Sequence, residues 1–114
     1  MDIEKKEING RLRTVGTVEI EYEGKTEKVG IMKLNFGEDL SIRNRNTKVK
    51  LLGGQPDVKI DQENLTLENL NKAIVEAPFE LNIESIKMLD KDVATELLEA
   101  FNELNNPSKK KDEN

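Results

Sequence analysis

The hydrophobic pattern changes its period between the two halves of the chain, and this change restricts the fold more than any other feature. In Thr17-Val18-Glu19-Ile20-Glu21-Tyr22, apolar side chains alternate with polar ones, which is the pattern of a strand with one wet face. Over residues 64–104, apolar side chains instead recur every three or four positions, as in helices with one buried stripe. The sequence therefore predicts an α+β fold: an N-terminal β-hairpin or small antiparallel sheet, followed by a C-terminal helical part of three to four short helices.

The clearest strand signal is a hairpin over roughly residues 17–34. Glu23-Gly24-Lys25 supplies a glycine-containing turn, and a second run with Val29 and Ile31 on one face follows it. Residues 1–16 fit neither the strand period nor the helix period.

A short helix is expected directly after this hairpin. Leu34-Asn35-Phe36-Gly37 has the pattern of a strand exit, and Glu38 and Asp39 follow where the helix dipole favours acidic side chains. Leu40 is the expected inward-facing residue, helped by Ile42 or by Phe36 packing back.

Three further helical segments are expected in the second half. One covers about residues 64–77 and ends at Pro78; Asn82 is placed to cap a short helix, and Asp90 to cap a longer one that stops at Asn105-Asn106-Pro107. The buried stripe of the last helix is expected to be Val93, Leu97, Ala100, Phe101 and Leu104. We expect residues 1–105 to form a single domain and residues 106–114 to be a disordered charged tail.

Residues 46–60 lose any clear period and contain the flexible loop Gly53-Gly54-Gln55-Pro56. The apolar residues on either side of this loop have no evident place in the expected core. They either form short, locally buried strands or dock on a partner, as in a protein that binds hydrophobic segments.

The same region is basic. Residues 40–56 carry four basic side chains and no acidic one, whereas residues 61–105 hold 3 Lys/Arg against 11 Asp/Glu. The basic strip either faces the acidic half of its own chain or binds an acidic partner. Nucleic acid is the weakest reading, because no aromatic residue is interleaved for base stacking. The partner-binding residues predicted from the apolar and basic patterns are Met32, Arg43, Arg45, Lys48, Lys50, Leu51, Leu52, Val58 and Ile60.

Composition argues against most catalytic sites. With no Cys and no His, the chain cannot form a disulfide, a thiolate nucleophile, a Cys/His zinc site or a Ser-His-Asp triad. Asp90 and Asp92 flank a helix start, where capping explains them better than a metal site, and Gly53-Gly54 lacks the spacing of a phosphate-binding loop. We therefore expect a non-enzymatic protein with no catalytic residue, cofactor or metal. The absence of an apolar run of about 18 residues and of a signal-peptide core predicts no membrane association.

Several of these segments together resemble the tail assembly chaperones of long-tailed phages and related archaeal viruses. The resemblance covers about residues 17–105. It includes the hairpin, the turn Leu34-Asn35-Phe36-Gly37-Glu38 into a short helix, the end of the following helix at Ala77-Pro78-Phe79, and the closing segment Val93-Ala94-Thr95-Glu96-Leu97-Leu98-Glu99-Ala100-Phe101. The insert at residues 46–60 has no counterpart in the family pattern.

The resemblance implies a chaperone that binds the tape measure protein during virion assembly, keeps it soluble and helps recruit tail tube subunits. It also implies that the protein works in the host cytoplasm, is absent from the mature virion, and exists in a second form made by ribosomal frameshifting, for which Lys109-Lys110-Lys111 is the expected position. A homo-oligomer is left open. The alternatives are a small structural virion protein that joins head and tail and, second, a nucleic-acid-binding regulator, which the acidic helices disfavour.

Overall fold

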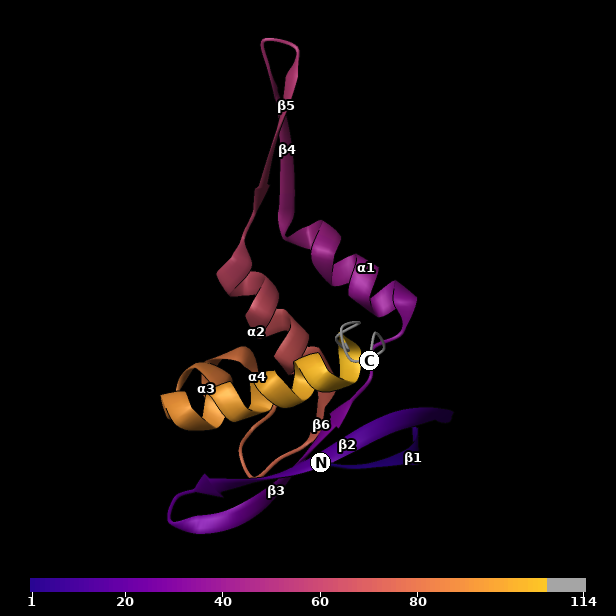
Figure 1. The fold of residues 1–114 in the computed structure, drawn as a ribbon, viewed down its shortest axis with the longest axis vertical. Helices are drawn as coiled ribbons and strands as arrows, with labels where there is room; N and C mark the ends of the chain where they lie inside the picture. Colours follow the sequence, from indigo (N-terminus) through magenta and orange to yellow (C-terminus); the bar gives the residue numbers. More distant parts are fainter. Residues whose placement is uncertain (107–114) are drawn as a thin grey trace, which may run out of the picture.

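The computed structural model describes residues 1–106 and confirms the α+β fold (Figure 1). A four-stranded antiparallel sheet with strand order β1-β2-β3-β6 is accompanied by four helices and by a separate two-stranded hairpin, β4-β5. The elements in chain order are β1 (Asp2–Ile8), β2 (Arg11–Tyr22), β3 (Lys25–Met32), α1 (Phe36–Arg45), β4 (Thr47–Leu52), β5 (Gln55–Ile60), α2 (Gln62–Ala73), β6 (Ile74–Glu76), α3 (Ile83–Lys87) and α4 (Lys91–Asn105).

The predicted N-terminal hairpin is confirmed as β2 and β3. Val18 pairs with Val29 in the antiparallel register, and Glu23 and Gly24 form the turn with positive φ values of 50° and 80°. Strand β2 begins earlier than expected, at Arg11, and residues 2–8 add β1 as an outer strand. The sheet is therefore larger than the hairpin that the alternation indicates.

The main core lies between the sheet and the three C-terminal helices, with α4 lying across the sheet (Figure 1). The predicted stripe of α4 is buried, and Leu97 has no exposed surface. The side chain of Asn82 caps α3 as expected, by accepting a hydrogen bond from the Ser85 backbone N–H at 2.8 Å. The buried cluster consists of Ile20, Val29, Ile31, Leu70, Ala73, Ile74, Ile86, Val93, Leu97, Ala100, Phe101 and Leu104.

Three expectations about the helices are wrong in detail. Asp90 occupies the N-cap position of α4, but its side chain makes no capping hydrogen bond. The helix expected over residues 64–77 is α2, which ends at Ala73, because Ile74–Glu76 leaves the helix to pair with β3 as β6. Leu40 is not the inward residue of α1: its side chain is 37% exposed, whereas Ile42 is buried. Residues 74–76 continue the helical spacing of apolar residues, so their own pattern predicts a helix. They form a strand because they pair with the free edge of β3.

Helix α1 and the β4–β5 hairpin stand apart from this core (Figure 1). Helix α1 begins with a capping box, in which Asn35 accepts from the Glu38 backbone N–H and Glu38 accepts from that of Asn35. Its one buried side chain is Ile42. The helix therefore leads the chain away from the body and ends where β4 begins.

Candidate functional site

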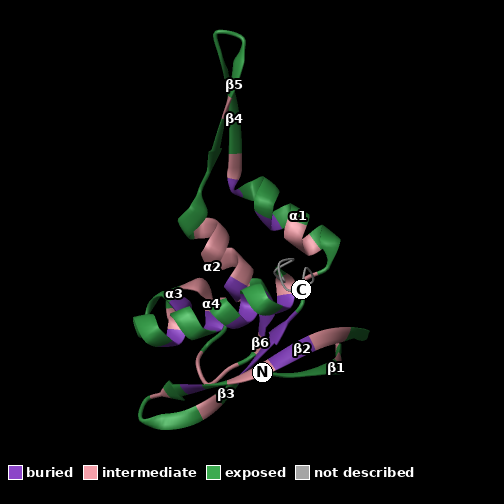
Figure 2. Cartoon of the chain, in the orientation of Figure 1, coloured by how far each residue is buried: buried purple, intermediate pink, exposed green. Residues whose placement is uncertain are grey.

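The β4–β5 hairpin is the most exposed part of the fold. It extends beyond the helices, and Figure 2 colours it as exposed over almost its whole length. Its turn consists of Gly53 and Gly54, with φ values of 60° and 82°, which is the geometry of a two-residue type I′ turn. The expected loop at residues 53–56 is thus a tight turn followed by the start of β5, and the residues that flank it form two short strands, as one of the two interpretations has it. These strands are not locally buried, so local burial does not explain the apolar residues.

The pairing register separates the hairpin side chains by chemistry. Directly paired residues of an antiparallel ladder point to the same side, so Val49 and Val58 share a face with Leu51 and Pro56. Lys48 and Lys59 share the opposite face with the pair Lys50 and Asp57. We call the first side the apolar face, made of Val49, Leu51, Pro56, Val58 and Ile60, and the second the lysine face, made of Lys48, Lys50, Leu52, Gln55, Asp57 and Lys59.

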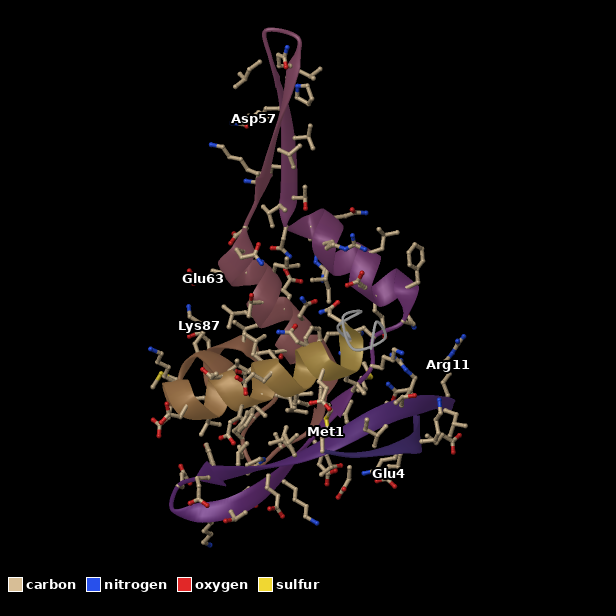
Figure 3. The ribbon with its side chains drawn as sticks, in the orientation of Figure 1. Met1, Glu4, Arg11, Asp57, Glu63 and Lys87 are labelled. Atoms are coloured by element: carbon tan, nitrogen blue, oxygen red, sulfur yellow. The ribbon has the colours of Figure 1, made fainter. Side chains whose placement is uncertain are left out.

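The apolar face lies open to solvent. The exposed fraction is 75% for Leu51 and between 54% and 61% for Val49, Val58 and Ile60. Figure 3 shows the hairpin side chains standing clear of the helices. A two-stranded hairpin gains little stability by itself in water, and an uncovered apolar face on such an element makes it the candidate contact surface of this chain.

The structure brings together some of the predicted partner-binding residues and separates others. Leu51, Val58 and Ile60 lie on the apolar face, whereas Leu52 lies on the lysine face next to the turn. Met32 must be removed from the predicted contact surface. It pairs with Val15 in the sheet and is only 5% exposed, so no partner reaches it.

The basic residues of the predicted surface divide into two groups. Arg43 forms an ion pair with Asp39 of its own helix at 2.7 Å, and Arg45 pairs with Glu68 of α2, so both bind acidic groups of their own chain. In the described part of the chain, no ion pair involves Lys48 or Lys50. Arg45 therefore contacts the acidic half of its own chain, as one interpretation of the basic strip predicts. Lys48 and Lys50 are the basic residues that are accessible to a partner.

A polar cluster fixes the base of the hairpin. Asn46 is 4% exposed; its side-chain amide donates to the Ile42 carbonyl at 2.8 Å and to the Glu68 carboxylate at 3.1 Å. Asn64 donates to Asn46 Oδ1 at 2.6 Å and to Glu68 at 2.8 Å, and Arg45 Nε donates to Glu68 at 3.0 Å. This network joins the end of α1 to α2 on both sides of the hairpin, and thereby sets the direction in which it points.

Glu68 is the charged centre of this cluster. The hydrogen bond from Arg45 lowers the pKa of Glu68 below the ordinary carboxyl value; burial opposes the shift, and the amides of Asn46 and Asn64 add to it. The cluster therefore stabilises the ionised form of the Glu68 carboxyl group. Sequence patterns do not reveal the cluster, since its members lie on two helices about 20 positions apart.

A second polar contact holds the start of α1. Arg13 of β2 donates to the Glu38 carboxylate at 2.6 Å and to the Lys33 carbonyl at 3.1 Å. Burial raises the pKa of Glu38, but hydrogen bonds from Arg13 and the Asn35 backbone N–H, together with the charges of Arg13 and Lys72, outweigh it and lower the pKa overall. Helix α1 is thus tied at both ends by charged groups, which positions the hairpin relative to the sheet.

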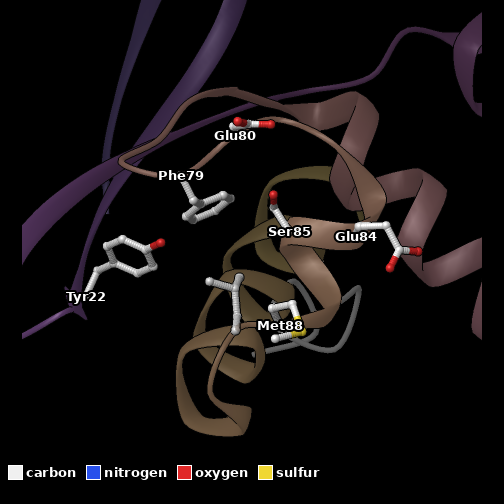
Figure 4. A pocket seen from close by; sticks show the side chains of 7 residues that line it. Tyr22, Phe79, Glu80, Glu84, Ser85 and Met88 are labelled. Atoms are coloured by element: carbon white, nitrogen blue, oxygen red, sulfur yellow. The ribbon is translucent and has the colours of Figure 1, made fainter.

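The described residues also include an open pocket of about 390 Å³ beside α3 (Figure 4). The rings of Tyr22 and Phe79 lie 5.7 Å apart at one side of it, and Ser85, Glu80 and Glu84 are among the polar groups that line it. No histidine or lysine lines it that could serve Ser85 as a base.

The described part of the chain holds no cluster of three or more Asp or Glu side chains suited to a metal ion. None of the described helices has the length and apolar character needed to cross a membrane.

In comparisons with protein families, with curated proteins and with solved structures, nothing matched this chain.

Proposed function

We propose that this chain is a non-enzymatic tail assembly chaperone that binds the tape measure protein of a long-tailed virus and keeps it soluble while tail tube subunits are recruited. The observation that carries the proposal is the apolar face of the β4–β5 hairpin, which is uncovered and held at a fixed angle to the body. A protein that must cover apolar surface on another chain needs such a face. We assign the predicted interaction with an acidic segment of the partner to Lys48 and Lys50.

The dimensions of the hairpin suit a helical partner. Six-residue strands span about 20 Å, and two strands with their side chains are about as wide as one helix. Since a helix rises about 1.5 Å per residue, one hairpin covers about 13 residues of it. The apolar stripe of the partner lies on Leu51 and Val58, and the acidic body of the chaperone adds charge that opposes aggregation.

The binding test is co-expression with a candidate tape measure protein, a long helix-rich chain encoded by the same genome. The variant L51S/V58S makes the apolar face polar, and we expect it to reduce the soluble yield of the partner at least about tenfold. The matched control D57S/K59S changes two residues of the lysine face on β5, neither of which is assigned a partner contact, and keeps the yield within about threefold. Equal yields with L51S/V58S and with the unaltered protein would contradict the proposal, as would a partner that is soluble alone.

The proposal also concerns where the protein is found. A chaperone acts in the host cytoplasm and is absent from the mature virion, so mass spectrometry of purified particles should not detect residues 1–106. Stoichiometric amounts in the particle would instead indicate a structural protein that joins head and tail. The frameshift position expected at Lys109-Lys110-Lys111 lies outside the described residues, and the nucleotide sequence there tests it.

A further inference from the structure

One edge of the β4–β5 hairpin carries backbone groups that face solvent. In a two-residue turn the closing pair, here Leu52 and Gln55, is a hydrogen-bonded pair, and such pairs alternate along an antiparallel ladder with pairs that are not. Val49 and Leu51 belong to pairs whose two residues are not hydrogen-bonded to each other. Their N–H and C=O groups therefore point outward from β4, away from β5.

The opposite edge is interrupted. Pro56 pairs with Leu51 and stands at an outward-pointing position of β5, where it has no N–H to donate. Proline at such a position is a common means of preventing strand pairing at a sheet edge. The hairpin thus has one edge suited to accept another strand, that of β4, and one edge that is blunted.

Charge distinguishes β4 from the outer strand of the main sheet. Along β1 the sequence Glu4-Lys5-Lys6-Glu7 mixes both signs, and Lys6 forms ion pairs with Glu4 at 3.5 Å and with Glu76 at 3.9 Å. Along β4, Lys48 and Lys50 point to one side and carry a single sign, and no ion pair within the described residues involves them. The β4 edge therefore selects by charge as well as by hydrogen bonding.

We propose that the free edge of β4 is a strand-addition site for an extended segment of a second protein in which apolar and acidic residues alternate. The added strand extends the ladder at Val49 and Leu51, places its acidic side chains beside Lys48 and Lys50, and its apolar side chains beside the apolar face. This inference goes beyond the proposed function and does not depend on it.

Two proline variants test which edge is used. V49P removes the outward N–H of β4, and V58P makes the same change at the directly paired position of β5. Both take one valine from the apolar face, and both place proline where it breaks no hydrogen bond between the two strands. The probe is a short fluorescent peptide of alternating valine and glutamate, and binding is measured by fluorescence anisotropy with the full chain. We expect V49P to weaken binding at least about fivefold and V58P to leave it within about twofold.

Hydrogen exchange keeps the test independent of how well the variants fold. Saturating peptide should slow exchange of the Val49 and Leu51 amides in the unaltered protein, while Val58 and Ile60 change little. Loss of binding in both proline variants, or protection on β5 in place of β4, would overturn the proposal.

Charge reversal tests the chemistry of the occupant. K48E/K50E should lose the valine–glutamate peptide and should bind a valine–lysine peptide that the unaltered protein binds at least about tenfold more weakly. Equal affinity of the unaltered protein for both peptides would contradict the charge assignment. Sedimentation that shows self-association of the full chain, abolished by V49P, would mean that a second copy occupies the edge and would also overturn the proposal.

Discussion

At the scale of single residues, charged and amide side chains determine where the hairpin points. Asn46 and Asn64 contribute little apolar surface, yet their amides and the Glu68 carboxylate connect the two ends of the hairpin to α1 and α2. A buried amide without its partner costs more than the hydrogen bond itself contributes. These residues are therefore as important for the orientation of the binding surface as the apolar residues are for its affinity.

The depressed pKa of Glu68 gives this cluster a defined pH dependence. Because the folded state holds the ionised carboxylate, the cluster stabilises the fold fully above the ordinary carboxyl pKa and loses that contribution as the pH falls through the lowered value. We expect E68Q to reduce the free energy of unfolding by about 1 kcal/mol at pH 7, a figure kept small because Arg45 is largely exposed. Urea denaturation at pH 7 and pH 3 measures it.

The difference between E68Q and the unaltered protein should shrink at pH 3, below the ordinary carboxyl pKa, because holding the Glu68 carboxylate ionised there no longer adds its full stability. E96Q is the control, since Glu96 is exposed on α4 and no ion pair in the described region involves it. A stability loss in E68Q that is equally large at both pH values would show that the charge of Glu68 contributes nothing.

At the scale of elements, the hairpin turn depends on the backbone freedom of glycine. Gly53 and Gly54 both have positive φ, and little surrounds either Cα, so the demand is conformational rather than steric. We expect G53V to disrupt the hairpin and G53N to preserve it, since asparagine adopts the left-handed conformation readily. The measurement is the NOE between the α-protons of Val49 and Val58, a close pair in this register.

For both turn variants, the thermal stability of the body should change little, because the hairpin buries almost nothing. An unchanged NOE in G53V would mean that the strands, and not the turn, determine the hairpin.

The elements also show how much of the fold could be predicted from the sequence. The alternation of Val18, Ile20 and Tyr22 and the stripe that includes Leu97 and Phe101 identify β2 and α4, because each pattern matches a face that the fold buries. For β1 and β6, the pattern of apolar residues does not match the structure that forms. Strand β1 is charged on both faces, so it has no alternation, and β6 keeps a helical spacing and becomes a strand only through pairing with β3.

The binding surface itself was partly readable. Lys48-Val49-Lys50-Leu51 alternates, and two glycines separate it from a second apolar run, which together are the signals of a hairpin. The residues of the surface could thus be named, and short strands were one of the two interpretations of them, although their exposure could not be predicted. The polar cluster around Glu68 could not be predicted, since it depends on contacts between helices, and the inclusion of Met32 failed because its side chain is buried beside that of Val15 in the sheet.

At the scale of the whole molecule, the buried core and the proposed binding surface are made of separate residues. The core lies between the sheet and the C-terminal helices, while the exposed apolar residues of the hairpin lie beyond α1. Because these exposed apolar residues lie outside the core, they are the residues that we propose for contact with a partner.

Two leucine variants measure this separation. L97A removes a fully buried side chain, and we expect it to reduce the free energy of unfolding by about 3 kcal/mol. L51A removes a side chain that is 75% exposed, and we expect a change within about 0.5 kcal/mol. Urea denaturation compares them directly. A loss in L51A comparable to that in L97A would mean that the hairpin belongs to the folding core.

The central claim is that the apolar face of the hairpin is where this protein holds its partner. Hydrogen exchange of the chain alone and in complex with the tape measure protein, followed by mass spectrometry, tests it most directly. We predict that protection on binding is concentrated in residues 47–60, while the sheet and α4 exchange as in the free protein. Protection confined to β1, β2 and β3, with residues 47–60 unchanged, would contradict the claim.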